Sequence, residues 1–130
     1  MDFDVEKTVQ YWLNGAEYDR DVAGAMFQST KYPYALFMGH LSIEKLMKAL
    51  FVRYTKKHAP YIHSLPKLAS MLSFEIPDEI KAKLDVFMEY YFQTRYPEEQ
   101  IQFYKKCTKS YTEQALKDTE EVFEWLKKRL

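Results

Sequence analysis

Several titratable side chains of this sequence fall among apolar residues that recur at helical spacing. Glu44 and Lys48 lie in one apolar row, and His40 lies in the row beside it. Asp19 fills a gap in an earlier row, and Arg95 ends a later one. Buried charges are normally paired, so one interpretation is an internal network such as Asp19–Arg95 or Glu44–Arg95 that holds helices in register. The other is a polar pocket between helices in which these groups bind a phosphate or a base.

The segment from Phe87 to Tyr104 is dense in aromatic residues and is followed by two lysines. Aromatic faces beside cations are what the stacking of nucleobases requires. Tyr96, Phe103 and Tyr104 are the better candidates for this role, because they lie in a segment without helical periodicity, whereas Phe87 and Tyr91 already fit a core-facing row. A partner interface is the alternative, since tyrosine is enriched at such surfaces.

Other chemistries find no support in the sequence. His58 and His63 flank a loop without a cysteine at ligand spacing, and no His-Glu-x-x-His pattern occurs. Cys107 has no activating neighbour in sequence, and there is no glycine-rich phosphate loop. The sequence therefore predicts no metal site and no cofactor.

Composition points to a cytoplasmic protein without a membrane segment. Lys+Arg and Asp+Glu are both 19, so the formal net charge is zero, and nucleic-acid binding would need a local basic patch. A single cysteine excludes an internal disulfide framework and suits a reducing compartment. The acidic start lacks a signal peptide's regions, and no apolar run approaches the ~20 residues that span a bilayer.

Helical periodicity runs through most of the chain, and no strand-like alternation exceeds a few residues. Together with capping residues and prolines, it predicts five helices, over about 4–28, 33–57, 64–72, 77–95 and 110–128. Residues 96–109 show no convincing period and are expected to be irregular. Irregular segments of this length are often functional or mobile. The prediction is one all-α domain over residues 1–130, an antiparallel up-and-down four-helix bundle with an additional short helix.

Four stretches resemble the HEPN domain family. They are Gly39-His40-Leu41-Ser42-Ile43-Glu44-Lys45-Leu46-Met47-Lys48-Ala49-Leu50, His63-Ser64-Leu65, Thr94-Arg95-Tyr96-Pro97, and Ala16-Glu17-Tyr18-Asp19 with Val22-Ala23. The resemblance implies a four-helix bundle with a short accessory helix, commonly dimeric. It also implies binding of nucleotides or RNA, often beside a minimal nucleotidyltransferase partner as in toxin–antitoxin pairs, and RNA cleavage in some branches.

The RNA-cleaving branches carry an arginine followed, after four to six residues, by a histidine. Arg95 matches the arginine, but the histidine positions hold Gln100, Ile101 and Gln102. Arg53 and His58 have the spacing, but they lie at the end of the second predicted helix rather than the fourth. Glu44 matches the family's acidic partner, so the binding half of the pattern is present without the catalytic histidine.

The leading hypothesis is a nucleotide-binding HEPN-type domain that works with a nucleotidyltransferase. Its predicted nucleotide-binding residues are Arg95, Glu44, Lys48, His40, Tyr96 and Tyr104, while Asp19 and His63 are assigned to a structural polar network. One alternative is a metal-independent RNA-cleaving toxin that uses Arg95, Glu44 and His58. Another is a structural interaction subunit without a ligand.

The second predicted helix carries more apolar surface than one side of a small bundle buries. Phe37, Leu41 and Phe51 lie beside its main apolar row. This surplus predicts a symmetric homodimer that covers part of the second row.

Overall fold

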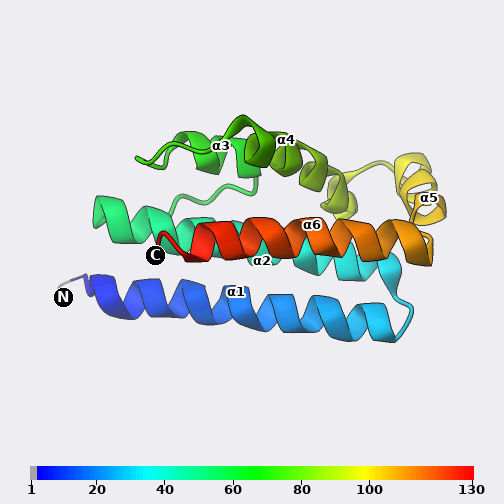
Figure 1. The fold of residues 1–130 in the computed structure, drawn as a ribbon, viewed down its shortest axis with the longest axis horizontal. Coiled ribbons are helices and arrows are strands. Elements are labelled where there is room, and N and C mark those ends of the chain that lie inside the picture. The colour runs from blue at the N-terminus through cyan, green and yellow to red at the C-terminus, as the bar shows by residue number, and fades with distance from the viewer. Residues whose placement is uncertain (1–2) are drawn as a thin grey trace.

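The computed structural model describes residues 3–130, and within that range the chain forms six α-helices and no strand. The chain passes up and down the bundle, with α1 and α4 in one direction and α2 and α6 in the other (Figure 1). The all-α prediction is confirmed. The helices are α1 (Val5–Gln28), α2 (Tyr32–Thr55), α3 (Leu65–Ser70), α4 (Asp78–Phe87), α5 (Pro97–Lys106) and α6 (Lys109–Lys127).

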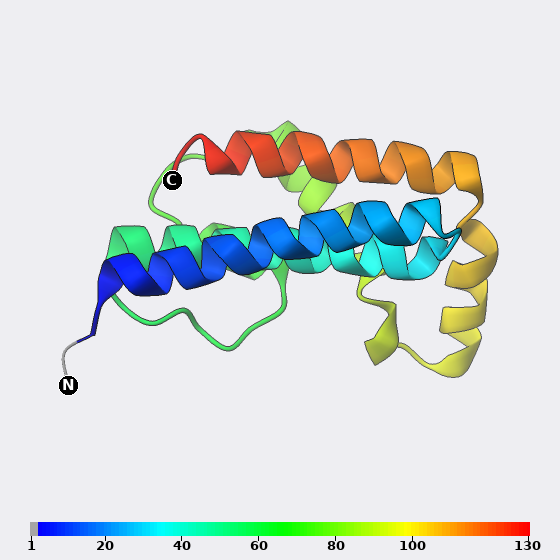
Figure 2. The ribbon, with the colours of Figure 1, turned by 90° about the horizontal axis from the view of Figure 1, so that it is seen from below.

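α1 and α2 form a long helical hairpin. Asp4 caps α1, because its carboxylate accepts a hydrogen bond from the backbone N–H of Lys7 at 3.0 Å. The turn between the helices places Thr30 at a φ of 62°, and Pro33 lies in the first turn of α2. α1 packs along α2 and contacts α6 only slightly, so it lies at the edge of the bundle (Figure 2).

α2 is the central helix of the fold. Of its 24 residues, 13 are buried, whereas α1 of equal length buries four. The main core gathers around α2 and receives side chains from α3, α4 and α6, including Leu68, Leu84 and Phe123. Residues of α2 are therefore the ones that the bundle can orient most firmly.

The predicted fourth helix is wrong in its second half. α4 ends at Phe87 rather than near Arg95, and two 3-10 turns follow it over Met88–Tyr90 and Phe92–Thr94. Tyr91, with φ −84° and ψ 58°, leaves the helical conformation between the two turns. A continuous α-helix would point Tyr90 and Phe92 about 200° apart. The break lets both bury 99% of their surface together with Phe87.

The prediction that residues 96–109 are irregular is also wrong, because this segment contains α5. Only Phe103 of this ten-residue helix is buried, which explains why no apolar period was visible. Its ends nevertheless have ordinary helix chemistry, with Pro97 in the first turn and Lys105 and Lys106 in the last.

The apolar surplus of α2 finds partners within the chain. Phe37 stacks on Tyr91 with ring centroids 5.3 Å apart and also packs edge-on against Phe92. Phe51 packs against the main core. Two of the three side chains that predicted a homodimer, Phe37 and Phe51, therefore have partners in the segment after α4 and in the core.

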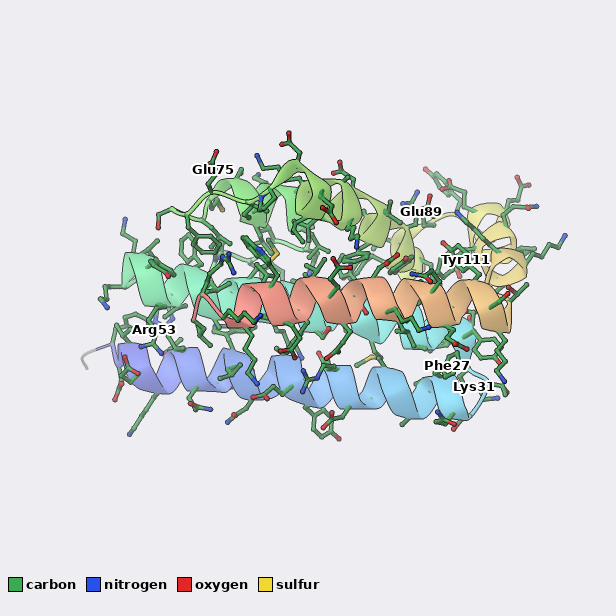
Figure 3. The ribbon with its side chains drawn as sticks, viewed as in Figure 1. Phe27, Lys31, Arg53, Glu75, Glu89 and Tyr111 are labelled. Carbon is green, nitrogen blue, oxygen red and sulfur yellow. The ribbon has the colours of Figure 1, made fainter. Side chains whose placement is uncertain are left out.

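The two ends of the bundle differ. α1 begins and α6 ends at one end, whereas α5 lies across the other (Figure 1). Arg53 marks the first end, and Glu89 and Tyr111 mark the α5 end (Figure 3). None of the helices in residues 3–130 is both long enough and apolar enough to span a bilayer.

Candidate functional site

The predicted polar residues of α2 converge on the carboxylate of Glu44. One oxygen of Glu44 lies 3.1 Å from Nζ of Lys48 and 3.1 Å from Nδ1 of His63, which precedes α3. The other oxygen lies 3.4 Å from Nε2 of His40. The Nζ atom of Lys48 also lies 5.2 Å from the ring centroid of Trp12 on α1. We call Glu44, Lys48, His40 and His63 the Glu44 cluster.

Burial and charge act in opposite directions on Glu44. Burial alone would raise the pKa of this carboxyl, but the hydrogen bond from His40 and the charge of Lys48 outweigh it, so the pKa is lowered. The ionised carboxylate can only accept hydrogen bonds, so Nδ1 of His63 donates to it. Glu44 is thus a buried anion that its own chain holds in place.

Most of the Glu44 cluster is closed to a ligand. His40 is fully buried, and its two ring nitrogens each lie 3.2 Å from a backbone oxygen, of Phe87 and of His63. Glu44 and Lys48 are each 4% exposed. Only His63, whose side chain is 41% exposed and stacks on Tyr91, reaches the surface. The cluster therefore ties α2 to the segments around α3 and α4.

Asp19 takes part in a separate pair. Its carboxylate is nearly buried and lies 2.8 Å from Nζ of Lys45. The predicted pairs Asp19–Arg95 and Glu44–Arg95 are both wrong, because the carboxylates find lysines of α2. The pair of Asp19 with Lys45 is separate from the contact of His63 with Glu44.

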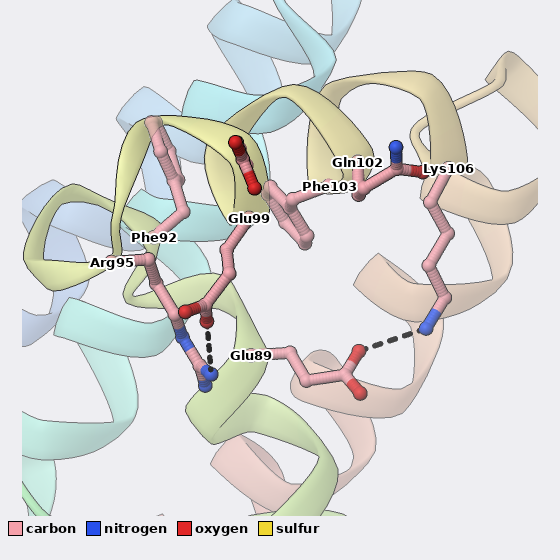
Figure 4. Close-up of a pocket in the computed structure, with 8 residues that line it drawn as sticks. Glu89, Phe92, Arg95, Glu99, Gln102, Phe103 and Lys106 are labelled. Carbon is pink, nitrogen blue, oxygen red and sulfur yellow. Dashed lines mark hydrogen bonds and ion pairs between the residues drawn. The ribbon is translucent and has the colours of Figure 1, made fainter.

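Arg95 lies apart from the Glu44 cluster and faces a hollow at the α5 end of the bundle (Figure 4). The chain is extended at Arg95, with φ −90° and ψ 158°, so the side chain follows neither α4 nor α5. The hollow has a volume of about 440 Å³. It is lined by Glu89, Phe92, Arg95, Glu98, Glu99, Gln102, Phe103 and Lys106.

Two ion pairs flank this hollow. Nη1 of Arg95 lies 3.4 Å from Glu99, and Nζ of Lys106 lies 2.9 Å from Glu89 (Figure 4). The hydrogen bond to Glu89 raises the pKa of Lys106. All four side chains are between 40% and 51% exposed, so solvent screens both pairs and neither fixes its cation firmly. Both cations can therefore turn toward a ligand.

Two aromatic residues form the inner wall of the hollow, whereas Tyr96 and Tyr104 are not among the residues that line it. Phe92 and Phe103 stack with ring centroids 5.4 Å apart and are almost completely buried. Tyr104 packs edge-on against Phe92 and remains 46% exposed, while Tyr96, next to Arg95, is 78% exposed. The six residues predicted to bind a nucleotide thus divide into two groups. Arg95, Tyr96 and Tyr104 belong to the segment from the end of the second 3-10 turn through α5, and Glu44, Lys48 and His40 to the buried cluster.

Sequence reasoning singled out Phe103, which lines the hollow, but it missed Glu89 and Glu99 as lining residues. The spacing of four between Arg95 and Glu99 was a usable signal, since such pairs lie close where a helix begins. Glu89 gave no signal, because its contact with Lys106 spans 17 residues and depends on how α5 folds back. Within residues 3–130, no group of three or more His, Cys, Asp or Glu side chains is arranged to hold a metal ion.

Comparison with known proteins assigns the family. The model of the HEPN domain matches residues 9–130, and the chain belongs to the HEPN family. Among solved structures, the crystal structure of TT1696 from Thermus thermophilus has the same fold, with a TM-score of 0.80. The two chains share 21% identity over 94% of this chain and 98% of that one. No curated protein matches the sequence.

Proposed function

We propose that this HEPN domain binds a nucleotide in the Arg95 hollow. The observation that carries the proposal is the pair of half-exposed cations, Arg95 and Lys106, that face one hollow with a phenylalanine wall. A volume of about 440 Å³ lies within the usual range of small-molecule sites. The nucleotide-binding function of the leading hypothesis is kept, but its site moves away from Glu44.

In this proposal, Arg95 binds the phosphate. Its planar fork suits phosphate oxygens better than the point charge of a lysine does. A phosphate replaces Glu99 as the partner of the guanidinium, while Lys106 supplies a second positive charge. Tyr96 does not line the hollow, but it follows Arg95 in the chain and is mostly exposed, so it is the proposed residue for stacking on the base.

The charge of the lining limits what can bind. Three carboxylates, of Glu89, Glu98 and Glu99, face two cations, so the formal charge of the hollow is −1. Like charges repel, so a monophosphate binds better than a triphosphate in the absence of a divalent cation. We expect a dissociation constant between high micromolar and millimolar, or about 4–6 kcal/mol.

The family resemblance supports two proposed partners. One is a minimal nucleotidyltransferase, as in toxin–antitoxin pairs, and the other is a second copy of the chain. A structural interaction subunit without a ligand is the second candidate function. The closed Glu44 cluster favours it, because three of four predicted polar residues there are buried and satisfied within the chain.

A thermal-shift assay with nucleoside mono- and triphosphates at millimolar concentration tests the proposal. A monophosphate should raise the melting temperature of the wild type, Arg95→Ala should abolish the rise, and Arg95→Lys should restore little of it. Arg53→Ala is the control, because Arg53 forms a partly exposed ion pair with Glu6 at the opposite end of the bundle. If no nucleotide shifts the wild type, the interaction subunit is the better description.

A further inference from the structure

A second, smaller hollow lies beside the middle of α1, where this helix packs along α2 (Figures 1 and 2). It measures about 300 Å³. Five residues of α1 and one residue of α2 line it. They are Tyr11, Trp12, Asn14, Gly15, Tyr18 and Lys45. We call it the Gly15 hollow, and it shares no lining residue with the Arg95 hollow.

The walls of the Gly15 hollow are aromatic. Tyr11 and Tyr18 are 70% and 71% exposed, so both stand out from the surface of the helix. They are seven residues apart, which is about 10.5 Å along a helix. Aromatic rings attract one another at centroid separations of about 4.5–7 Å, so a flat ring midway between the two tyrosines contacts both. Trp12, whose ring meets that of Tyr11 edge-on at 5.3 Å, adds a third aromatic side chain.

A lysine ammonium forms the floor between the two tyrosines. Residue 15 is glycine, and Nζ of Lys45 lies 3.7 Å from the position that a Cβ of Gly15 would take. Asp19 holds this ammonium in place, because its carboxylate lies 2.8 Å from Nζ. The side chain of Lys45 is 32% exposed and that of Asp19 only 6%, so the cation is the member of the pair that a ligand reaches.

The polar side chains of the Gly15 hollow offer hydrogen-bond donors. An ammonium can only donate, and Gln10 already donates to Oδ1 of Asn14 at 2.7 Å, so Asn14 has its amide N–H groups left for a ligand. Within residues 3–130, no carboxylate lines this hollow, whereas three line the Arg95 hollow. The lining therefore suits a ligand that accepts hydrogen bonds and carries negative charge.

We propose that the Gly15 hollow binds a small aromatic carboxylate. The ring lies between Tyr11 and Tyr18, and the carboxylate accepts hydrogen bonds from Lys45 and Asn14. A volume of about 300 Å³ is at the lower end of small-molecule sites, which fits a ligand of one or two rings. A planar cation, which aromatic side chains otherwise attract, is disfavoured because the ammonium of Lys45 repels it.

Three probe ligands, each titrated against the backbone amide signals of the protein by NMR, test the chemical class. Naphthoate should bind the wild type with a dissociation constant of about 0.1–1 mM and shift the signals of residues 11–18. Naphthamide has the same rings without the charge and should bind about fivefold more weakly, because it loses the charged contact with Lys45. Acetate, a carboxylate without a ring, should not saturate the site below about 50 mM. Changing the charge of the ligand rather than Lys45 leaves Asp19 paired and the fold intact.

Two pairs of matched variants test the location. Gly15→Ala places a methyl group on the floor and against Lys45, so it should weaken naphthoate binding by at least about fivefold. Gly24→Ala is its control, because a Cβ there meets no atom within 4 Å. Tyr18→Ser removes one wall and should weaken binding by about fivefold. Tyr61→Ser is its control, because Tyr61 lies outside α1 and is 92% exposed. Melting temperatures without ligand show that the variants are folded.

Arg95→Ala separates the two hollows and should leave naphthoate binding unchanged. Four results would overturn the proposal. The first is a wild type that shows no saturable binding at about 10 mM naphthoate. The second is equal affinity for naphthoate and naphthamide. The third is equal binding by a variant of the Gly15 hollow and its control. The fourth is loss of binding in Arg95→Ala, which would assign naphthoate to the Arg95 hollow. None of these results contradicts nucleotide binding, which rests on other residues.

Discussion

The Nδ1 atom of His63 donates a hydrogen bond to a buried oxygen of Glu44 at 3.1 Å. This contact joins the middle of α2 to the segment that leads into α3, 19 residues further along the chain. The same carboxylate also pairs with Lys48 one turn further along α2, so a single anion both neutralises a buried lysine and joins α2 to the segment before α3.

The stability of the fold should therefore depend on the ionisation of Glu44. Its pKa is lowered in the folded state from an ordinary value of 4.5, so the folded protein binds this proton less readily than the unfolded chain does. The free energy of unfolding that the ionised Glu44 contributes is fully present above about pH 4.5. It is lost as the pH falls through the pKa of Glu44 in the folded protein. Urea unfolding measures this loss when it is repeated between about pH 3 and 7, a range that includes the ordinary pKa of a carboxyl group.

Glu44→Gln should destabilise the protein by about 3 kcal/mol at neutral pH, because it leaves Lys48 buried without a counter-charge. It should also flatten the pH dependence below 4.5. Glu113→Gln is the control, since Glu113 forms only an exposed pair with Lys117 and should change stability by less than about 0.5 kcal/mol. An equally steep acid transition in Glu44→Gln would contradict the assignment.

The glycines of α1 should respond differently to alanine. A Cβ at Gly24 meets no atom within 4 Å, so Gly24→Ala should stabilise the protein by about 0.5–1 kcal/mol through helix propensity. A Cβ at Gly15 lies 3.1 Å from Cδ of Lys45, so Gly15→Ala should gain less or lose stability. Urea midpoints with unchanged m-values measure both effects, and an equal gain at Gly15 would show that Lys45 moves freely.

Phe37 should stabilise the fold rather than an interface between copies of the chain. Phe37 stacks on Tyr91 within the chain, so Phe37→Ala should destabilise the fold by about 2 kcal/mol without changing the sedimentation of the folded protein. If Phe37→Ala abolishes a dimer while the protein stays folded, the interface includes the second apolar row of α2.

The purified protein should not cleave RNA at an enzymatic rate. Attack by a 2′-OH needs a proton acceptor, a role that histidine fills well near neutral pH. The motif positions hold Gln100, Ile101 and Gln102, and the side chain of Gln100 donates to the backbone oxygen of Arg95 at 2.9 Å. A time course on labelled RNA checks this, and cleavage that His58→Ala abolishes would show that the motif was placed wrongly.

Local chemistry predicted the long helices well because their signals lie within each segment. Asp4 and Ser64 cap α1 and α3, and the apolar periods of α1, α2 and α6 follow their buried faces. α5 was missed because it buries one residue, although Pro97 and its terminal lysines indicated it. Capping residues do not depend on burial, so in short exposed helices they deserve as much weight as apolar periodicity.

Partners across helices could not be read from the sequence. Asp19 pairs with Lys45, and Lys106 with Glu89, because of how the helices are placed beside one another. Periodicity tells which face of a helix is buried, but it does not tell which neighbour covers it. The break at Tyr91 then turned Arg95 away from Glu44, so residues predicted as one site became two.

The placement of the chain ends has a practical consequence. α1 begins and α6 ends at one end of the bundle, and the Arg95 hollow lies at the other (Figures 1 and 4). A fluorescent reporter or a second domain fused before α1 or after α6 would emerge on the side away from the hollow. Tethering through either end therefore leaves the hollow open to solvent, and immobilised protein can be probed there without shielding.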